Sequence, residues 1–313
     1  MQAEGKTGAG WSGWAGLSLC MAPETLAMVL DDGQAFRWFP LGEGVYQGIW
    51  GRHLLRLRSG EGGRVEWSAP LGREAEALPA LRDYLALDCG FEGMADALPW
   101  RSDAHLARCM REFPGLRLLR QPLGETLLCF MCSATKQIPQ IKQMGDALAR
   151  DLGSPLPLPR GFGAGQASAG TVVFRQSLHA LPTWGQVAAA SEAQLRACAL
   201  GFRAGNIHRT AQVLAGEPGW LEETAALPYE QAHARLTTLP GVGDKIADCV
   251  LLYSGTRLCA FPVDTWIIKV MARHYGLEGW APEQVAHFGR RHFGAAAGLA
   301  QQFLFNWERH RAG

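Results

Sequence analysis

The sequence carries almost no net charge and no long apolar run. Its 30 lysine and arginine residues are balanced by 29 aspartate and glutamate residues, so the formal net charge of +1 gives no overall signal for nucleic acid. No stretch reaches the roughly 18 apolar residues that a membrane-spanning helix needs. The glycine-rich start, MQAEGKTGAGWSGWAG, lacks the apolar segment of a secretory signal. These absences predict an intracellular protein without a membrane partner.

The sequence also lacks the cysteine spacing of a zinc site or a disulfide framework. Cys129 and Cys132 form a C-x-x-C pair inside the apolar run TLLCFMCS, but no second pair offers further ligands. We therefore favour helix packing for this pair over metal or redox chemistry. The other six cysteines are Cys20, Cys89, Cys109, Cys198, Cys249 and Cys259.

Residues 22 to 75 contain short apolar runs separated by glycine-rich turns. The runs LAMVLDD, AFRWF, VYQGIW, HLLRLR and RVEWSA alternate in the manner of strands and predict an antiparallel sheet. From Glu74 the spacing becomes helical, as in EAEALPALRDYLAL and DAHLARCMREF, and stays so to the end of the chain. The exception is GFGAGQASAGTVVF, residues 161 to 174, whose glycines follow no phosphate-binding pattern and predict a flexible loop.

The chain is therefore expected to be mainly α-helical with an α+β N-terminal domain. Its 313 residues suffice for two domains or three tightly packed lobes, and 48% hydrophobic residues suffice for a sizeable core. We place a flexible tail at residues 1–20, the α+β domain at residues 21–112 and a helical domain at residues 113–313.

The stretch LPGVGDKIADC, residues 239 to 249, joins two expected helices by a tight turn. YEQAHARLTT precedes the turn and DKIADCVLLY follows it. Gly241 and Gly243 leave backbone N–H groups uncovered at the start of the second helix, where the helix dipole favours an anion. The turn is expected to hold a phosphate without reading sequence, as a protein that scans DNA requires. A helix corner without a ligand is the alternative.

Lys245 lies in the first turn of that second helix. The helix dipole and the apolar neighbours Ile246 and Val250 disfavour the charged ammonium form. A neutral amine is a nucleophile that can form a Schiff base with a sugar C1′. Cys249, one turn further on the same face, suits a pocket for a base. The alternative is an exposed lysine paired with Asp248.

Asp264 precedes another expected helix, in CAFPVDTWIIKVMARHYG. An ordinary N-cap would suffice to explain this aspartate. A capping carboxylate can still present its second oxygen outward, where it could orient the amine of Lys245, receive a proton or stabilise a cationic sugar.

These motifs together resemble the helix-hairpin-helix DNA glycosylases. LPGVGDKIADC is followed by Asp264 in PVD, nineteen residues after Lys245. GQAFRW, residues 33 to 38, and GLRLLRQ, residues 115 to 121, are similar to the 8-oxoguanine DNA glycosylase branch. The resemblance covers about residues 23 to 308. It implies a twisted antiparallel sheet domain and a two-lobed helical core around a cleft.

The resemblance implies a role for each matching residue around the extruded base. Lys245 matches the nucleophile and Asp264 the catalytic carboxylate. The carbonyl of Gly33 matches the acceptor of the N7–H that only the oxidised guanine carries. Cys249 and Phe305 match the pair that sandwiches the base, and Gln301 matches the reader of its Watson–Crick edge. In QQFLFNWERH, Gln301 and Phe305 share a helical face, although core packing of Phe305 is the commoner arrangement.

Other matches concern the rest of the duplex. Phe202 matches an aromatic wedge, with core packing as the alternative, and Arg203 matches an arginine that reads the opposite cytosine. Thr135 stands where many relatives have the first residue of an asparagine triplet, and Gln140 where they have a second cytosine-reading arginine. Trp266 replaces a phosphate-contacting histidine of some relatives. These departures predict a different filling of the gap and weaker discrimination of the opposite base.

We therefore expect a monomeric, bifunctional DNA glycosylase and apurinic-site lyase that removes 8-oxoguanine from duplex DNA. No redox cofactor or catalytic metal is expected, and an alkali cation is a candidate ligand of the hairpin carbonyls. No cysteine follows Cys259, so no iron–sulfur cluster is expected. A bacterial cytoplasm or nucleoid is favoured over a eukaryotic nucleus. The alternatives are a glycosylase for other damaged bases and a non-catalytic DNA-binding hairpin protein.

Overall fold

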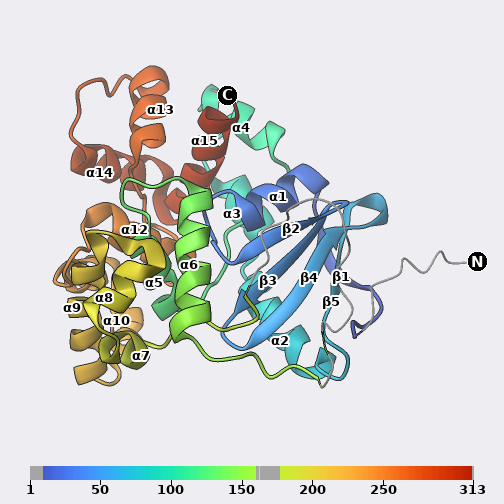
Figure 1. Cartoon of the computed structure of the whole chain (residues 1–313). Helices are drawn as coiled ribbons and strands as arrows, with labels where there is room; N and C mark the ends of the chain where they lie inside the picture. The colour runs from blue at the N-terminus through green and yellow to red at the C-terminus, as the bar shows by residue number, and fades with distance from the viewer. Residues whose placement is uncertain (1–9, 160–161, 163–176, 312–313) are drawn as a thin grey trace, which may run out of the picture.

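The N-terminal part of the chain forms a five-stranded antiparallel sheet (Figure 1). The computed structural model describes residues 10–159, 162 and 177–311. The strand order is β1-β5-β4-β3-β2, so β2 to β5 form a meander and β1 adds to its far edge. The strands are β1 (Ala15–Cys20), β2 (Trp38–Gly42), β3 (Val45–Trp50), β4 (His53–Ser59) and β5 (Arg64–Ser68).

The segment up to residue 20, expected to be a flexible tail, is in fact part of this sheet from Ala15 onward. In β1, Ala15 pairs with Trp67 of β5, and Leu17 is buried. Upstream of the strand, the Trp11 side chain packs into a small apolar cluster with Ile49 and Leu54. The glycine content of the segment concealed these anchoring side chains. Residues 1–9 lie outside the described ranges.

A second prediction was wrong at LAMVLDD, which forms a helix and not a strand. Helix α1 (Pro23–Asp31) has proline in its first turn, where the missing N–H costs nothing. Its buried side chains Leu26, Val29 and Leu30 follow helical spacing. The short apolar run satisfied both periodicities, and the proline before it decides for the helix.

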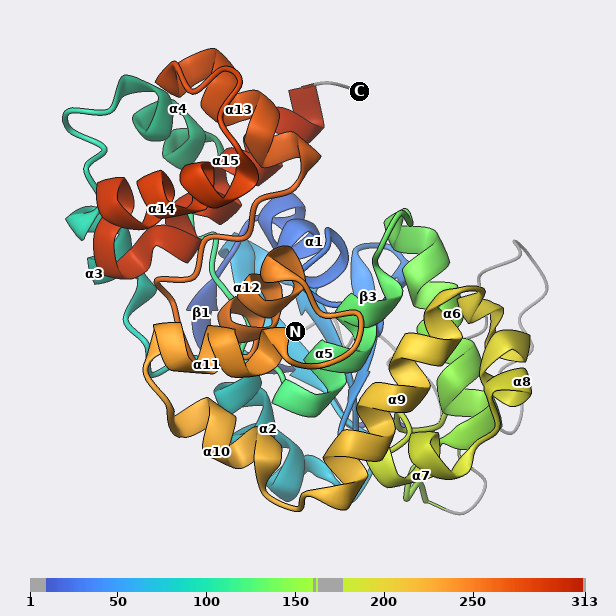
Figure 2. The ribbon, with the colours of Figure 1, turned by 90° about the vertical axis from the view of Figure 1, so that its left-hand side faces the viewer.

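The remainder of the described chain is helical, as predicted. Figure 2 shows α4, α13, α14 and α15 grouped on one side and α6 to α9 on the other, with α5 and α12 between them. This arrangement confirms the predicted sheet domain and two-lobed helical core. The predicted loop at residues 161–174 lies outside the described ranges except for Phe162. The helices are α2 (Glu74–Tyr84), α3 (Phe91–Ala97), α4 (Ala104–Glu112), α5 (Leu123–Cys132), α6 (Ile138–Leu152), α7 (Trp184–Ala189), α8 (Glu192–Leu195), α9 (Arg203–Gly216), α10 (Trp220–Ala226), α11 (Tyr229–Thr237), α12 (Asp244–Tyr253), α13 (Thr265–Tyr275), α14 (Pro282–Phe293) and α15 (Ala297–Arg311).

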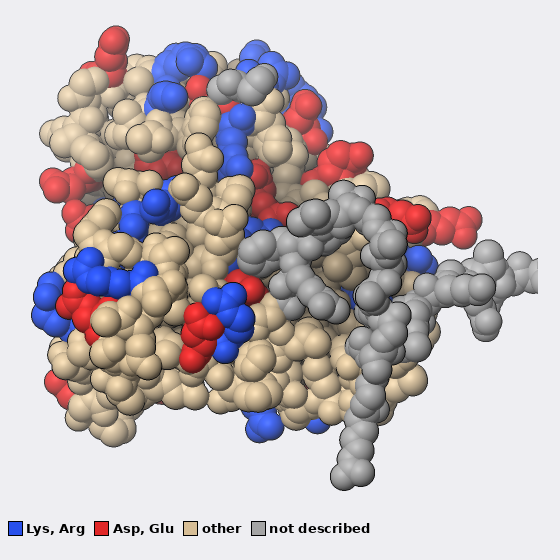
Figure 3. All heavy atoms as spheres, in the orientation of Figure 1, with Lys and Arg blue, Asp and Glu red and all other residues tan. Residues whose placement is uncertain are grey.

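The burial of a cysteine pair and the distribution of surface charge both agree with the sequence. Cys129 and Cys132 are buried in α5, which confirms their predicted packing role. On the face drawn in Figure 3, basic and acidic side chains are interspersed, in keeping with the near-zero net charge. Within the described ranges, no helix combines the length and apolar character that crossing a membrane demands.

Glu125 links the sheet to the helical core. Its carboxylate, on α5, accepts a hydrogen bond of 2.8 Å from the backbone N–H of Gly51, between β3 and β4. Burial raises the pKa of Glu125 to about 7, although the Gly51 N–H and the nearby Arg37 lower it. The folded protein therefore holds this proton at pH values where the unfolded chain has released it.

We expect Glu125→Gln to stabilise the protein at pH 8 but not at pH 4. The folded pKa lies above the unfolded value of 4.5, so folding stability from this group falls as pH rises from 4.5 to about 7. The shift corresponds to about 1–3 kcal/mol above pH 7, or several degrees in Tm. Thermal melts at both pH values check this, with the exposed Glu217→Gln as control. An equal change in Tm at the two pH values would contradict the assignment.

Candidate active site

The predicted hairpin lies between α11 and α12 and is shaped by glycine. Gly241 has a φ of +83°, and a Cβ built there would lie 2.7 Å from Asn206 of α9, so only glycine fits. Gly243 is the N-cap residue of α12 and has no side chain with which to cap it. Both glycines are exposed. The first N–H groups of α12 are thus presented at a surface where a phosphate can approach.

Lys245 sits half-buried in the first turn of α12. Its Nζ lies 5.8 Å from the centroid of the Phe130 ring, which stacks in parallel on Tyr253 at 5.3 Å. Among the described residues, no carboxylate lies within 4.0 Å of this nitrogen. The predicted alternative partner, Asp248, instead accepts a 2.6 Å hydrogen bond from the Tyr229 hydroxyl. The amine therefore lies near the stacked rings of Phe130 and Tyr253 and forms no salt bridge with a described residue.

Asp264 is the N-cap of α13, and the charge of Lys245 acts on its carboxylate. Its Oδ1 accepts hydrogen bonds from the backbone N–H groups of Trp266 and Ile267, at 3.0 and 2.9 Å. Burial raises the pKa of Asp264, while these N–H groups and the positive charge of Lys245 lower it. Asp264 can therefore cap α13 and still act on the Lys245 amine, because a single carboxylate oxygen accepts both N–H bonds of the helix.

Cys249 shares the environment of these two residues. Its side chain is buried on α12, one turn after Lys245. Burial raises the pKa of this thiol to about 12, with Lys245 acting in the lowering direction and Asp264 in the raising direction. The thiol therefore stays protonated and behaves as a polarisable packing surface and not as a nucleophile.

Gly33 and Phe305 are far apart in the sequence but lie close together in the structure. Gly33 follows α1 with a φ of +105°, and a Cβ there would lie 3.3 Å from Ile138 Cδ1 and 3.9 Å from Phe305 Cζ. Phe305 itself is half-buried on α15. The positive φ favours glycine at this position, and a Cβ would also require a small shift of the Ile138 side chain.

Gln301 lies on α15 beside the segment that leads to Asp264. The residue is 3% exposed, and its Nε2 donates a 3.1 Å hydrogen bond to the carbonyl of Pro262. Its Oε1 is buried without a hydrogen-bond partner among the described residues. Such an acceptor is costly to leave unpaired, and a ligand with a donor group would satisfy it.

Tyr253 is a site residue that the sequence analysis did not single out. Burial raises the pKa of its hydroxyl well above the usual value, and the negative charges of Asp264 and Asp32 act in the same direction. Its hydroxyl donates a 2.9 Å hydrogen bond to Gln302 of α15. Tyr253 therefore links α12, which carries Lys245, to α15. The i, i+4 spacing from Cys249 was the signal in the sequence.

The predicted wedge residues form a second group, around the start of α9. Phe202 is 65% exposed, so the core-packing alternative is wrong. The Arg203 guanidinium lies 4.3 Å from the centroid of the Phe202 ring. It donates to the Thr135 hydroxyl at 2.9 Å, to the Leu200 carbonyl at 3.3 Å and to the Ala134 carbonyl. Phe202, Arg203 and Thr135 are therefore one structural unit.

Gln140 and Trp266 occupy the starts of two other helices. The Gln140 side chain accepts a 3.2 Å hydrogen bond from the backbone N–H of Gln137 and so closes the capping box of α6. Trp266 is half-buried in the first turn of α13, with Lys269 Nζ 4.6 Å from its ring centroid. Thus Gln140 is engaged in capping, and Trp266 lies next to Asp264.

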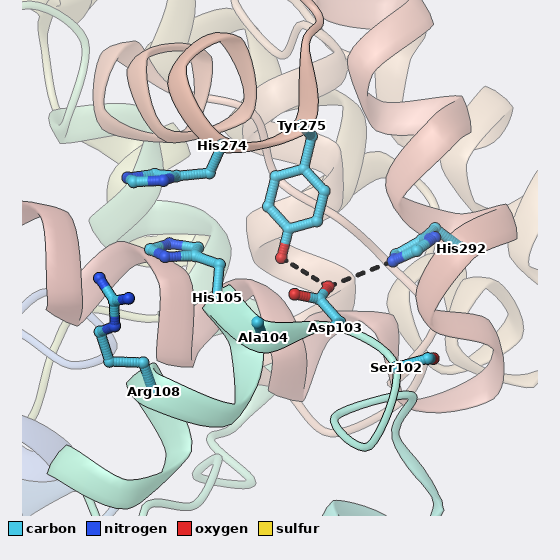
Figure 4. A pocket seen from close by; sticks show the side chains of 8 residues that line it. All are labelled: Ser102, Asp103, Ala104, His105, Arg108, His274, Tyr275 and His292. Carbon is cyan, nitrogen blue, oxygen red and sulfur yellow. Dashed lines mark hydrogen bonds and ion pairs between the residues drawn. The ribbon is translucent and has the colours of Figure 1, made fainter.

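A separate cavity of about 440 Å³ lies between α4, α13 and α14 (Figure 4). None of its lining residues is a predicted site residue. There the Asp103 carboxylate accepts hydrogen bonds from the Tyr275 hydroxyl at 2.8 Å and from His292 at 3.3 Å, if its Nε2 carries the proton. Burial lowers the pKa of His105 to about 4, so this imidazole offers no positive charge to an anion at neutral pH. We interpret Asp103 as a structural residue that links these helices.

Two family patterns match the chain. The pattern described as "8-oxoguanine DNA glycosylase, N-terminal domain" matches residues 20–127, and "HhH-GPD superfamily base excision DNA repair protein" matches residues 166–292. The N-glycosylase/DNA lyase OGG1 of Arabidopsis thaliana is 30% identical over an alignment that covers 93% of this chain and 79% of the relative. The chain belongs to the 8-oxoguanine DNA glycosylase family.

Two further similar proteins agree with this placement. The N-glycosylase/DNA lyase of Saccharomyces cerevisiae is 27% identical over 80% of this chain and 68% of the relative. The 8-oxoguanine glycosylase/lyase of Clostridium acetobutylicum, solved with double-stranded DNA containing cytosine opposite 8-oxoguanine, superposes with a TM-score of 0.78. It is 29% identical and 92% of each chain is covered. The resemblance seen in the sequence is thereby confirmed.

Proposed function

We propose that this family member is a bifunctional DNA glycosylase and apurinic-site lyase that excises 8-oxoguanine from duplex DNA. The observation that carries the proposal is the placement of Lys245 at the hairpin. Its amine lies near the Phe130 ring, and its charge lowers the pKa of Asp264. The names of the relatives, which include glycosylase and lyase activities, agree with it.

DNA binding begins at the backbone of the damaged strand. The N–H groups at the start of α12, next to Gly241 and Gly243, would hold a phosphate, and Trp266 would face a second one. Phe202 would enter the helix beside the opposite base while the target nucleotide turns out of the stack, at a cost of a few kcal/mol. An alkali cation on the hairpin carbonyls remains a prediction, as do a monomeric state and an intracellular location.

Base recognition would use Gly33, Gln301 and the pair formed by Cys249 and Phe305. The Gly33 carbonyl accepts a hydrogen bond from the N7–H of 8-oxoguanine, whereas guanine has an acceptor at N7 and would be repelled. The unpaired Oε1 of Gln301 would receive a donor from the Watson–Crick edge of the base. Cys249 and Phe305 would hold the two faces of the ring. Recognition would thus depend on the positions of the Gly33 carbonyl and of Gln301 Oε1.

The chemical steps would use only groups of the chain and the DNA. Lys245 Nζ attacks the sugar C1′, so that a C–N bond forms and the bond from C1′ to the base breaks. Asp264 stabilises the positive charge that develops on the sugar. Breaking of the bond from C1′ to the ring oxygen O4′ then opens the sugar and leaves an imine between Lys245 and C1′, while the departing base and O4′ take up the protons lost by the amine. The imine acidifies C2′, loss of a proton from C2′ expels the 3′ phosphate by β-elimination, and water later releases Lys245. No redox cofactor or catalytic metal takes part in this proposal.

Reading of the opposite base is expected to be modest. Both Nη atoms of Arg203 already donate, to Thr135, Ala134 and Leu200, and Gln140 caps α6. A bidentate contact from Arg203 to a cytosine would have to break some of these bonds first. The free energy gained from the cytosine is reduced by that cost.

Incubation with 8-oxoguanine duplexes and borohydride tests the proposed function. We expect a covalent adduct with 8-oxoguanine opposite cytosine. We also expect a single-turnover rate less than about tenfold slower opposite the other bases, because a full bidentate contact contributes about 1–3 kcal/mol and the bonds that Arg203 must break offset part of it. Release of alkylated bases alone would favour the alternative specificity. Salt-dependent DNA binding without any base release would favour the non-catalytic alternative.

A further inference from the structure

The two consecutive aspartates before Gly33 pair with side chains of two different helices. The Asp31 carboxylate pairs with Lys142 of α6. The Asp32 carboxylate pairs with Arg309 of α15, with 2.9 Å between Nη1 and Oδ1, and its Oδ2 lies 2.9 Å from Nε2 of His310. The turn that presents Gly33 is therefore held between α6 and α15.

The contact between Asp32 and Arg309 restrains the backbone as well as the side chain. Arg309 Nη1 also donates a 3.3 Å hydrogen bond to the backbone carbonyl of Asp32. The side chains are 12% and 30% exposed, so water competes less than it does for a surface pair. Fixing the carbonyl of Asp32 fixes the peptide plane that leads into Gly33.

Arg309 also lies against the other half of the recognition site. Its Nη1 is 3.9 Å from the position of a Cβ on Gly33, and its guanidinium carbon is 5.8 Å from the centroid of the Phe305 ring. One side chain therefore contacts the turn and lies over the ring that would stack on the base. Gly33 itself supplies no rigidity, because glycine is the least restricted residue.

We propose that Asp32 and Arg309 are positioning residues for lesion recognition, whose ion pair fixes the Gly33 carbonyl beside Phe305 and so sets the discrimination between 8-oxoguanine and guanine. The inference rests on the proposed function of this site. A carbonyl distinguishes a donor from an acceptor at N7 only if its direction is fixed, since hydrogen bonds weaken steeply with angle. A loosened turn lets the carbonyl rotate away from either base.

The test compares two reactions of the same enzyme. Asp32→Asn, Arg309→Gln and the double variant are assayed for single-turnover release of 8-oxoguanine and for β-elimination at a preformed abasic site, which requires Lys245 but no base. We expect base release to fall at least about tenfold and abasic-site cleavage to stay within about twofold. The double variant should be no slower than the slower single variant, because the pair acts as a unit.

Arg58→Gln is the matched control, since Arg58 forms a 2.7 Å pair with Glu66 in the sheet and is 31% exposed. Both rates should be unchanged in this variant, and Arg309→Lys should recover part of the base release. Unchanged base release in Asp32→Asn and Arg309→Gln would overturn the proposal. An equal fall of both reactions would also overturn it, because the pair would then only maintain the fold. A wild-type enzyme that leaves 8-oxoguanine in place would instead refute the proposed function, on which this inference rests.

Discussion

Lys245→Gln is expected to abolish the borohydride-trapped adduct and to slow base release by at least about a thousandfold, the scale on which loss of a covalent nucleophile acts. Glutamine has an uncharged amide of similar reach but cannot form an imine. The side chain is half-buried at the hairpin, and no described carboxylate pairs with it, so its replacement breaks no salt bridge. We therefore expect the variant to fold and to bind DNA.

Three measurements separate the chemical role of Lys245 from a binding role. Adduct formation and single-turnover release report chemistry, and titration of an 8-oxoguanine duplex reports affinity. Lys269→Gln serves as the control, because Lys269 is an exposed lysine on the neighbouring α13. This control should retain the adduct. An adduct formed by Lys245→Gln would show that another amine of the chain is the nucleophile.

The hairpin could be predicted from sequence because its determinants are local. Proline and glycine end one helix and start the next within residues 239 to 243, and the structure places α11 and α12 on either side as expected. The N-cap role of Asp264 was visible for the same reason. Its catalytic role was an independent hypothesis, and the cap geometry leaves room for it, since a single oxygen accepts both N–H bonds.

Local patterns were insufficient where two periodicities fit or where partners are distant. LAMVLDD satisfied the expectation for a strand, and only Pro23 and the burial of Leu26 and Leu30 distinguish the helix. The contact between Asp32 and Arg309 joins residues 277 positions apart. No spacing rule predicts such a pair, because it depends on how the sheet domain packs on the last helix.

The engagement of Arg203 could not be read from the sequence either. An arginine after an exposed aromatic residue suggests a side chain that is available for a ligand. In the structure, Arg203 is only 4% exposed and is held by Thr135, which has a φ of +56°. The unusual backbone of Thr135 is itself a tertiary feature. The role of Arg203 in reading a base therefore stays a prediction.

Asp264→Asn is expected to slow base release by about 10²–10⁴-fold while leaving the fold intact. Asparagine is as good an N-cap as aspartate, so Trp266 and Ile267 keep an acceptor and α13 keeps its start. Only the negative charge near Lys245 is lost. Asp264→Ala removes the cap as well and should cost about 0.5–2 kcal/mol of stability in addition.

The pH dependence of the rate distinguishes the effect of the Asp264 charge from the capping role of its side chain. Burial raises the pKa of Asp264 above 3.8, so the acidic limb of the wild-type rate profile should lie above that value. Ionisation of this group in the folded protein opposes stability as pH rises past 3.8, because the unfolded chain ionises first. Asp264→Asn should therefore lose the acidic limb and gain relative stability at neutral pH. If the limb persists in the variant, the titrating group is another residue, and Asp264 acts only as the cap of α13.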